Sequence, residues 1–396
     1  MVDEALPVPR RWGEAELVRL TAMVQQPSLF YWRGPQTTAL LENFRRHYPL
    51  QHCFPTASGS AALHVAVAAL RLRPGDEVIV PPITDMGSVI GILYQQGVPV
   101  FADVDPHTYN LDPADVRRRV TARTRALMPV HLAGNPCDMA ALTDIAREHG
   151  LAVIEDCAQA WGARWQRRPV GLAGHLACFS LNDFKHLSCG DGGIVGTNDP
   201  QLGPGLAKWG DKHYDRIAGG RDPEELAPNY RMSEPQAAVG AAQLERHDAI
   251  TGGRTRAGNL LTSLLSDTPG LQLPAVATGN THSYWFYLLR LDLARFGCPR
   301  EKVTAALTVE GVSCTAGYIP RPVYRYPVFQ NHNFFGGAWP VRDSGLTAMD
   351  YREARCPVAE AILADCVKLT INEAMSDEYI EKVARAVRVV AGRLAR

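Results

Sequence analysis

Several features that would assign this chain to a particular class of protein are missing from its sequence. No apolar run reaches the roughly 18 residues that cross a bilayer, and the opening residues, Met1 to Glu4, lack the basic and apolar regions of a signal peptide. Lys and Arg number 41, as do Asp and Glu, so the net charge of zero favours neither nucleic acid nor an anionic membrane. We therefore expect a cytoplasmic protein that binds neither.

Cysteine and glycine motifs are also missing. The nine cysteines are scattered without a C-x-x-C pair, which argues against a zinc site and against a secreted disulfide framework. We expect mostly buried thiols in a reducing cytosol, and no metal ion. No G-x-G-x-x-G follows a strand, so a dinucleotide site is not expected.

Short apolar segments alternate with helical stretches in the first half of the chain. The pattern predicts a helix over 61–70 and strands over 77–80, 98–104, 126–131 and 152–156. Short strands separated by helices predict a mainly parallel sheet covered on both faces, which is an α/β fold.

The pattern changes after about residue 250, where glycines become frequent. An aromatic and apolar strand is expected over 284–291, and helices over 300–309 and 376–394. We therefore expect two domains, a large one over residues 1–250 that includes an N-terminal arm, and a smaller α+β domain over residues 251–396.

Lys185 is the residue on which the functional prediction rests. Its neighbours Phe179, Phe184 and Leu187 are apolar, so a buried lysine with a lowered pKa is expected in place of a solvated one. Asp156 ends an apolar strand, where open α/β sheets bind ligands, although alone it would be read as a helix N-cap. A lysine that forms an imine, with an acid on a pyridine nitrogen, is how proteins hold pyridoxal 5'-phosphate (PLP). The pair therefore predicts a PLP enzyme.

A phosphate site is predicted where the first helix of the sheet domain begins. The free amides and dipole of a helix N-terminus suit a dianionic phosphate, and Gly59 allows the backbone to come close. An ordinary N-cap serine is the alternative interpretation. Ser180 could give a second hydroxyl to the phosphate, and Gln159 could hydrogen-bond the 3-oxygen of the cofactor.

A series of ordered motifs runs through residues 30–390: S-G-S-A-A-L-H, R-P-G-D-E-V-I-V-P, D-V-D-P-H-T-Y-N-L-D-P, P-V-H-L-A-G-N-P-C-D-M, I-E-D-C-A-Q-A, F-S-L-N-D-F-K and N-Y-R-M-S-E-P-Q-A-A-V-G-A-A-Q-L. In these motifs the chain resembles the DegT/DnrJ/EryC1/StrS family of PLP-dependent aminotransferases. The resemblance implies a fold-type I aminotransferase, whose large domain holds a mainly parallel sheet of the seven-stranded type. It also implies a homodimer with active sites shared between the subunits.

The resemblance assigns roles position by position. Lys185 matches the Schiff-base lysine, Asp156 the partner of the pyridine nitrogen, and Gln159 the neighbour of the 3-oxygen. The residues that match the phosphate cradle are Ser60, the backbone of Ala61 and Ser180. Asn229 and Arg231 match a segment that in relatives reaches the phosphate of the other subunit, and which of the two makes the contact stays open.

One position departs from the family pattern. Relatives carry an aromatic residue shortly after the two prolines, stacked on the cofactor ring, where this chain has Asp85 and Met86. Aspartate cannot stack on the ring, so either Met86 covers it or an aromatic residue from elsewhere in the chain does. An acidic group there could also accept a hydrogen bond from an amine or hydroxyl group of the substrate.

The implied reaction is a ping-pong transfer of an amino group from glutamate or glutamine to a ketone. The family aminates free keto-cyclitols and nucleotide-linked keto-sugars. Tyr318 and Arg321 are expected near the substrate, and their surroundings resemble the aminocyclitol branch more closely, as in antibiotic biosynthesis. The alternatives are a nucleotide-linked keto-sugar acceptor, and a PLP-dependent sugar dehydratase or epimerase, although dehydratases of the family replace the lysine that is present here. A non-catalytic regulator would need a basic patch or a helix-turn-helix, and neither occurs.

Overall fold

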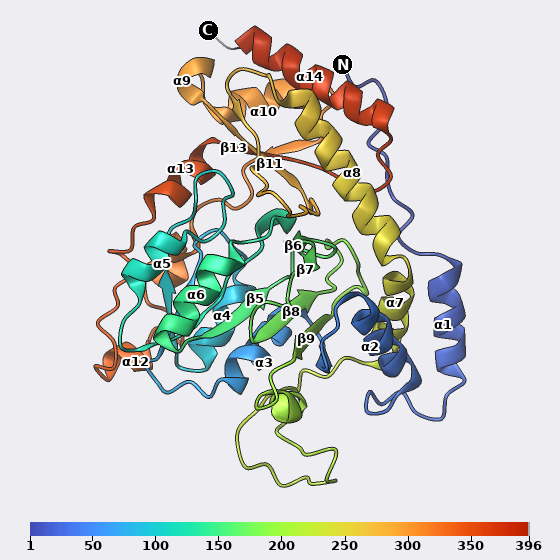
Figure 1. Ribbon diagram of the computed structural model, residues 1–396, viewed down its shortest axis with the longest axis vertical. Coiled ribbons are helices and arrows are strands. Elements are labelled where there is room, and N and C mark those ends of the chain that lie inside the picture. Colours follow the sequence, from blue (N-terminus) through green and yellow to red (C-terminus); the bar gives the residue numbers. More distant parts are fainter. Residues whose placement is uncertain (395–396) are drawn as a thin grey trace.

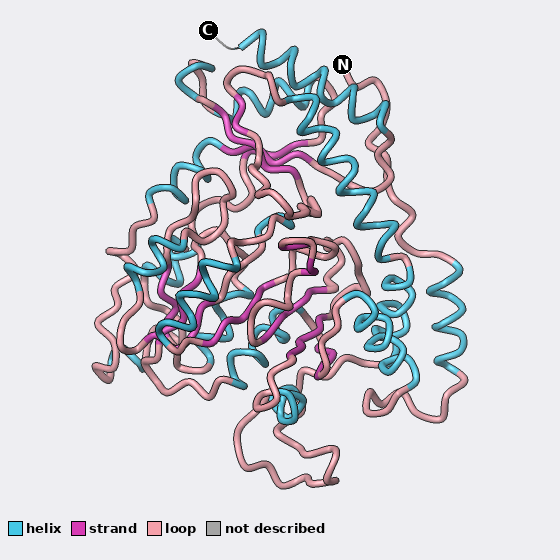
Figure 2. The backbone as a smooth tube through the Cα atoms, viewed as in Figure 1, coloured by secondary structure: helices cyan, strands magenta, loops and turns pink. Residues whose placement is uncertain are grey.

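Two sheets and the helices around them organise the chain, which a computed structural model describes over residues 1–394 (Figures 1 and 2). The larger sheet has seven strands in the order β1-β9-β8-β5-β4-β2-β3. They are β1 (His52–Thr56), β2 (Glu77–Val80), β3 (Val98–Phe101), β4 (Thr124–Leu127), β5 (Ala152–Asp156), β8 (Leu176–Ser180) and β9 (Gly193–Thr197). Neighbouring strands from β8 to β3 pair in parallel, and β9 is antiparallel to both β8 and β1. The predicted mainly parallel sheet is therefore confirmed.

Both faces of this sheet are buried, as its apolar strands predict. Cys178 faces helix α3, where its thiol lies 3.4 Å from the Ala62 carbonyl oxygen, while Ala177 and Phe179 pack in a second cluster with residues of α2 and α7. Alternate residues of a strand point to opposite faces, so each face of β8 has its own core. The helices near the sheet are α2 (Pro35–His47), α3 (Gly59–Ala69), α4 (Gly87–Tyr94), α5 (Pro113–Arg119), α6 (Met139–His149) and α7 (Glu234–Glu245).

The smaller sheet is antiparallel, with the order β10-β11-β13-β12. Its strands are β10 (Leu271–Gln272), β11 (Tyr287–Leu291), β12 (Cys314–Ala316) and β13 (Cys366–Leu369). The long helices α8 (His247–Leu265) and α14 (Asp377–Leu394) pack together beside it, with α10 (Arg300–Val309) against α14 (Figure 1). Both helices expected in this part are confirmed.

Shorter elements connect these layers. They are α1 (Glu14–Val24), η1 (Leu132–Gly134), β6 (Arg164–Trp165), β7 (Arg168–Pro169), η2 (Gly203–Gly210), α9 (Leu293–Phe296), η3 (Val323–Arg325), α11 (Pro327–Gln330), α12 (Pro340–Asp343) and α13 (Pro357–Asp365). No helix within residues 1–394 combines the length and apolarity of a membrane span. All nine cysteines are free thiols and six of them are buried, as expected.

Three strands are shorter or shifted relative to the sequence prediction. β3 ends at Phe101 because Asp103 turns away to accept hydrogen bonds from the amides of Val358 and Ala359 at the start of α13. β4 covers 124–127, since Pro129 has no N–H to continue the ladder. β11 begins only at Tyr287, so the aromatic residues before it are free to leave the sheet.

Glu155 ties the middle of the large sheet to the loop that precedes β8. Its buried carboxylate accepts hydrogen bonds from the amides of Gly171, Ala173 and Gly174 at 2.6–2.8 Å, and Nε2 of His131 lies 3.0 Å away. Burial acts to raise the pKa of this carboxyl group, but His131 and the amides outweigh it, so the pKa lies below its usual value. The charged form therefore stabilises the fold.

We predict that Glu155→Gln lowers the free energy of unfolding by about 3–5 kcal/mol at neutral pH, because a glutamine has one acceptor oxygen for donors that now use two. A lowered carboxyl pKa gives stability that is lost as pH falls through the folded-state pKa, so the difference between the variant and the wild type should shrink in acid. Urea unfolding at several pH values measures it.

The matched control is Glu148→Gln, since Glu148 is exposed and pairs with Arg117 at the surface. Its effect should stay within about 0.5 kcal/mol. Equal effects of the two substitutions would contradict the role given to Glu155.

Candidate active site

A cavity of about 230 Å³ lies beyond the carboxyl ends of strands β2, β5 and β8. This is the edge at which open α/β sheets bind ligands. The residues named from the sequence that line it are Gly59, Ser60, Asp85, Asp156, Gln159, Ser180 and Lys185. The remaining six, which lie outside the lining, are Ala61, Met86, Asn229, Arg231, Tyr318 and Arg321.

Lys185 lies in the turn after β8, with its amide donating to the Asn182 carbonyl at 2.9 Å. Its Nζ is 3.6 Å from the centroid of the Trp285 ring, an arrangement that favours a cation over the ring face. Burial lowers the pKa of Lys185 to about 8, while the carboxylates of Asp156 and Asp85 act in the opposite direction. Roughly one tenth of the amine is therefore neutral at pH 7.

The surroundings of Lys185 correct one expectation. Phe179 and Leu187 are fully buried, but the side chain of Phe184 is 76% exposed, so the prediction that it shields the lysine is wrong. The tight turn at 182–185 points this side chain outward, and its carbonyl accepts from Nε1 of Trp285 at 2.6 Å. Trp285, which leads into β11 of the small sheet, therefore gives the apolar cover.

Asp156, the last residue of β5, is buried beside the cavity. One carboxylate oxygen accepts from the Ala158 amide at 3.0 Å and the other from the Ser88 hydroxyl at 2.8 Å. Ser88 is bonded in turn to Thr84 at 2.6 Å. Burial raises the pKa of Asp156, and these hydrogen bonds oppose that effect. Sequence reasoning missed Thr84 and Ser88, whose positions after β2 were the available signal.

The start of α3 borders the cavity. Ser58 caps this helix and accepts from the Ala61 amide at 3.1 Å, so the Ala61 amide, which was expected to bind phosphate, already has a partner. The amides of Gly59 and Ser60 lie in the first turn, which leaves them without intrahelical partners. A Cβ at Gly59 would lie 2.6 Å from the Cβ of Ser180, so glycine is required for α3 to meet the end of β8.

Gln159 connects the cavity to the small sheet. Its Oε1 accepts from the Ala133 amide at 2.9 Å, and its Nε2 donates to the Tyr318 hydroxyl at 3.1 Å. Tyr318 therefore lies directly behind the lining. Arg321 is exposed and outside it, and its charge and that of Asp85 both act on the pKa of Tyr326, which burial raises.

Three residues named from the sequence lie elsewhere in their own chain. Arg231 pairs with Asp211 at 3.2 Å, and its guanidinium lies 5.3 Å from the centroid of the Phe30 ring. Asn229 forms an isolated β-bridge with the same Asp211. Met86 is half-buried and packs against the apolar core next to α4. None of the three borders the cavity of the described chain.

Comparisons with known proteins agree with this geometry. A model described as the DegT/DnrJ/EryC1/StrS aminotransferase family matches residues 13–388. A Streptoalloteichus tenebrarius protein described as an L-glutamine:3-amino-2,3-dideoxy-scyllo-inosose aminotransferase is 34% identical over 376 residues, which cover 91% of this chain and 88% of the relative. An Acidithiobacillus ferrooxidans protein described as a UDP-N-acetyl-3-dehydro-α-D-glucosamine 3-aminotransferase is 33% identical over 344 residues, 85% of this chain and 84% of the relative.

The solved structures include an aminotransferase from Psychrobacter cryohalolentis. It aligns with a TM-score of 0.86 at 28% identity, and the match covers 98% of this chain and 100% of that one. The likeness therefore extends over both sheets and includes the elements that surround the cavity.

We predict that the rate at which PLP attaches to the apoprotein rises about tenfold per pH unit and levels off near pH 8, because only the neutral amine of Lys185 reacts and its pKa is about 8. Asp85→Asn removes an anion that raises this pKa, so the plateau should begin at lower pH. Asp191→Asn, at another acid of the lining, should leave the profile unchanged. A plateau above pH 10 in the wild type would contradict the lowered pKa.

We also predict that Gly59→Ala weakens PLP binding. The added methyl group must displace Ser180, and overpacking of about 1–3 kcal/mol corresponds to a rise of about 5- to 150-fold in the dissociation constant. Equilibrium dialysis measures the constant. Gly252→Ala in α8, where nothing lies within 4 Å of the added carbon, is the control. Unchanged affinity in Gly59→Ala would remove α3 from the binding site.

Proposed function

Because the chain belongs to the DegT/DnrJ/EryC1/StrS aminotransferase family and is a PLP-dependent aminotransferase, we propose that it transfers an amino group from glutamine or glutamate to a free keto-cyclitol or keto-sugar. The observation that carries this choice of acceptor is the acidic lining of the cavity. Asp85 stands in it at the position where relatives have an aromatic ring, and Asp191 borders the same space.

The residues present fit PLP. Lys185 offers an amine of lowered pKa, Asp156 a buried carboxylate for the pyridine nitrogen, and the first turn of α3 with Ser60 and Ser180 a site for the phosphate. The glycine at 59 keeps α3 and β8 close enough for one phosphate to reach both. The chemistry that PLP supplies when bound is an electron sink for the carbon next to the amino nitrogen.

In the proposed reaction Lys185 moves protons. Its Nζ removes the proton from the donor carbon that carries nitrogen and, in the second half-reaction, returns a proton to the former ketone carbon. Asp156 keeps the pyridine nitrogen protonated throughout. The balance is that the donor amine becomes a keto acid while the acceptor ketone becomes an amine, so no external oxidant is needed.

The charges around the cavity support an acceptor without phosphate. Within residues 1–394, Lys185 is the one cation of the lining, and Asp85 and Asp191 are the carboxylates that remain when Asp156 serves the pyridine nitrogen. Carboxylates repel a diphosphate and accept hydrogen bonds from hydroxyl or ammonium groups. One carboxylate oxygen of Asp85 accepts a hydrogen bond from the Gly87 amide at 2.8 Å. This bond fixes the direction in which the other carboxylate oxygen points. The Streptoalloteichus relative carries an amino-cyclitol in its name.

A nucleotide-linked keto-sugar is the second candidate acceptor. The Acidithiobacillus relative is described by such a substrate, and the exposed Arg321 follows Tyr318 closely enough to take a diphosphate at the mouth. The two candidates therefore make opposite predictions for Asp85 and Arg321.

We also propose a location, an oligomeric state and a pathway for the enzyme. We place it in the cytoplasm as a homodimer in antibiotic biosynthesis, with Asn229 or Arg231 serving the active site of the other subunit. The position of both residues outside the cavity of their own chain supports this assignment.

The test begins with absorbance spectra of the holoenzyme before and after glutamine or glutamate. We predict that the donor converts the cofactor to its amine form in the wild type and that a keto-cyclitol such as scyllo-inosose restores it, whereas Lys185→Ala gives no turnover. Asp85→Asn should lower kcat/KM for the keto-cyclitol by at least about tenfold, the loss of about one charged hydrogen bond. Arg321→Ala should leave it unchanged.

Two other results of these measurements would contradict the proposal. Turnover of a nucleotide-linked keto-sugar alone, with loss in Arg321→Ala, selects the second candidate. A cofactor spectrum that no amino donor changes, with water lost from a sugar substrate, would point to a dehydratase.

A further inference from the structure

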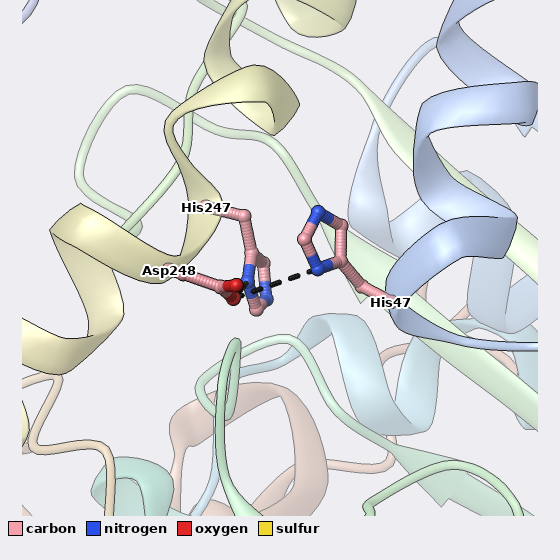
Figure 3. Close-up of side chains that lie close together, drawn as sticks. All are labelled: His47, His247 and Asp248. Atoms are coloured by element: carbon pink, nitrogen blue, oxygen red, sulfur yellow. Dashed lines mark hydrogen bonds and ion pairs between the residues drawn. The ribbon is translucent and has the colours of Figure 1, made fainter.

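Two histidines and an aspartate from distant parts of the chain lie close together (Figure 3). His247 is buried and Asp248 exposed, and none of the three lines the active-site cavity. His47 is the last residue of α2, and His247 and Asp248 begin α8. One oxygen of Asp248 lies 2.7 Å from Nδ1 of His247 and 3.5 Å from Nδ1 of His47. The two imidazole rings are stacked with their centroids 4.0 Å apart. One potential ligand atom from each side chain therefore lies within 4.8 Å of the other two.

We propose that His47, His247 and Asp248 bind a divalent transition-metal ion of the zinc class. Two imidazole nitrogens and a carboxylate oxygen form a usual ligand set for zinc. Ligand atoms that share one tetrahedral ion at about 2.0–2.2 Å lie roughly 3.3–3.6 Å apart, so the 3.5 Å between Asp248 and His47 fits an ion, while the 2.7 Å between Asp248 and His247 is shorter. The two stacked rings must turn apart for both nitrogens to reach one ion. Because the Asp248 side chain is 82% exposed, solvent can reach the ion and supply the fourth ligand.

Neighbouring groups hold His247 in a form that suits this role. Its Nε2 lies 3.1 Å from the Tyr48 hydroxyl, which also accepts from the Gly162 amide at 2.8 Å. Such a partner on the second ring nitrogen orients a metal-binding histidine and sets its tautomer. When Nδ1 binds the ion, the single proton of the neutral ring is carried by Nε2, which donates to the Tyr48 hydroxyl.

The site has a limited affinity and a structural consequence. Arg164 is close enough to act on the pKa of both His247 and Asp248, and its positive charge opposes a cation. With three protein ligands we expect weaker binding than in a closed four-ligand site. An ion bound here joins the end of α2 to the start of α8, two elements far apart in sequence. The role is therefore a cross-link between helices, separate from the amino-transfer chemistry.

Cobalt(II) added to the holoenzyme tests the proposal, because its visible absorption reports the ligands around it. We expect one Co²⁺ per chain with d–d bands typical of nitrogen and oxygen ligands, and displacement of these bands by Zn²⁺. His47→Ala and Asp248→Asn should each weaken binding by at least about tenfold, the lower end of the loss found even for second-sphere partners. Both positions are partly or fully exposed, and an unchanged cofactor spectrum verifies that the variants are folded.

The matched control is His149→Ala. His149 is a partly exposed histidine that lies 3.7 Å from Glu148, and it belongs to no such cluster in the described chain. It should bind Co²⁺ as the wild type does. Tyr48→Phe, which keeps the ring and removes the hydroxyl next to His247, should weaken binding without abolishing it. Absence of cobalt bands in the wild type, or equal binding by His47→Ala and Asp248→Asn, would overturn the proposal and leave a hydrogen-bonded cluster.

Discussion

The structure depends on two adjacent buried carboxylates at the end of β5. Successive side chains of a strand point to opposite faces, so Glu155 faces the loop at 171–174 and Asp156 faces the cavity. Glu155 receives enough donors to stay charged despite burial, whereas burial dominates at Asp156 and raises its pKa. One strand end therefore supplies both the anchor of the sheet and a buried acid that borders the cavity.

The same balance between burial and charge sets the state of Lys185. Burial alone would favour a neutral amine, and Asp156 and Asp85 restore part of the preference for the ammonium form. An amine that can gain or lose a proton near neutral pH is what proton transfer at carbon requires. Asp85 thus contributes twice, to the charge state of the lysine and to the acidic lining of the cavity.

Local patterns in the sequence were sufficient for part of this result. The four residues of β2, the end of β5 at Asp156 and the lysine at 185 follow from apolar runs, turns and family motifs that lie next to each other in the chain. The outward direction of Phe184, the hydrogen bond from Ser88 to Asp156 and the partner of the Ala61 amide could not be predicted. Each depends on a backbone turn or on a contact between segments that only the folded chain brings together.

Trp285 illustrates how the two sheets share the active site. It lies just before β11 of the small sheet, yet its ring covers Lys185 of the large one. Its carbonyl accepts from the buried Arg254 of α8 at 3.2 Å, and Arg254 also bonds Glu373 and the Ile371 carbonyl. The helix that starts at His247 therefore holds, within its first turns, the group that positions the aromatic cover of the lysine.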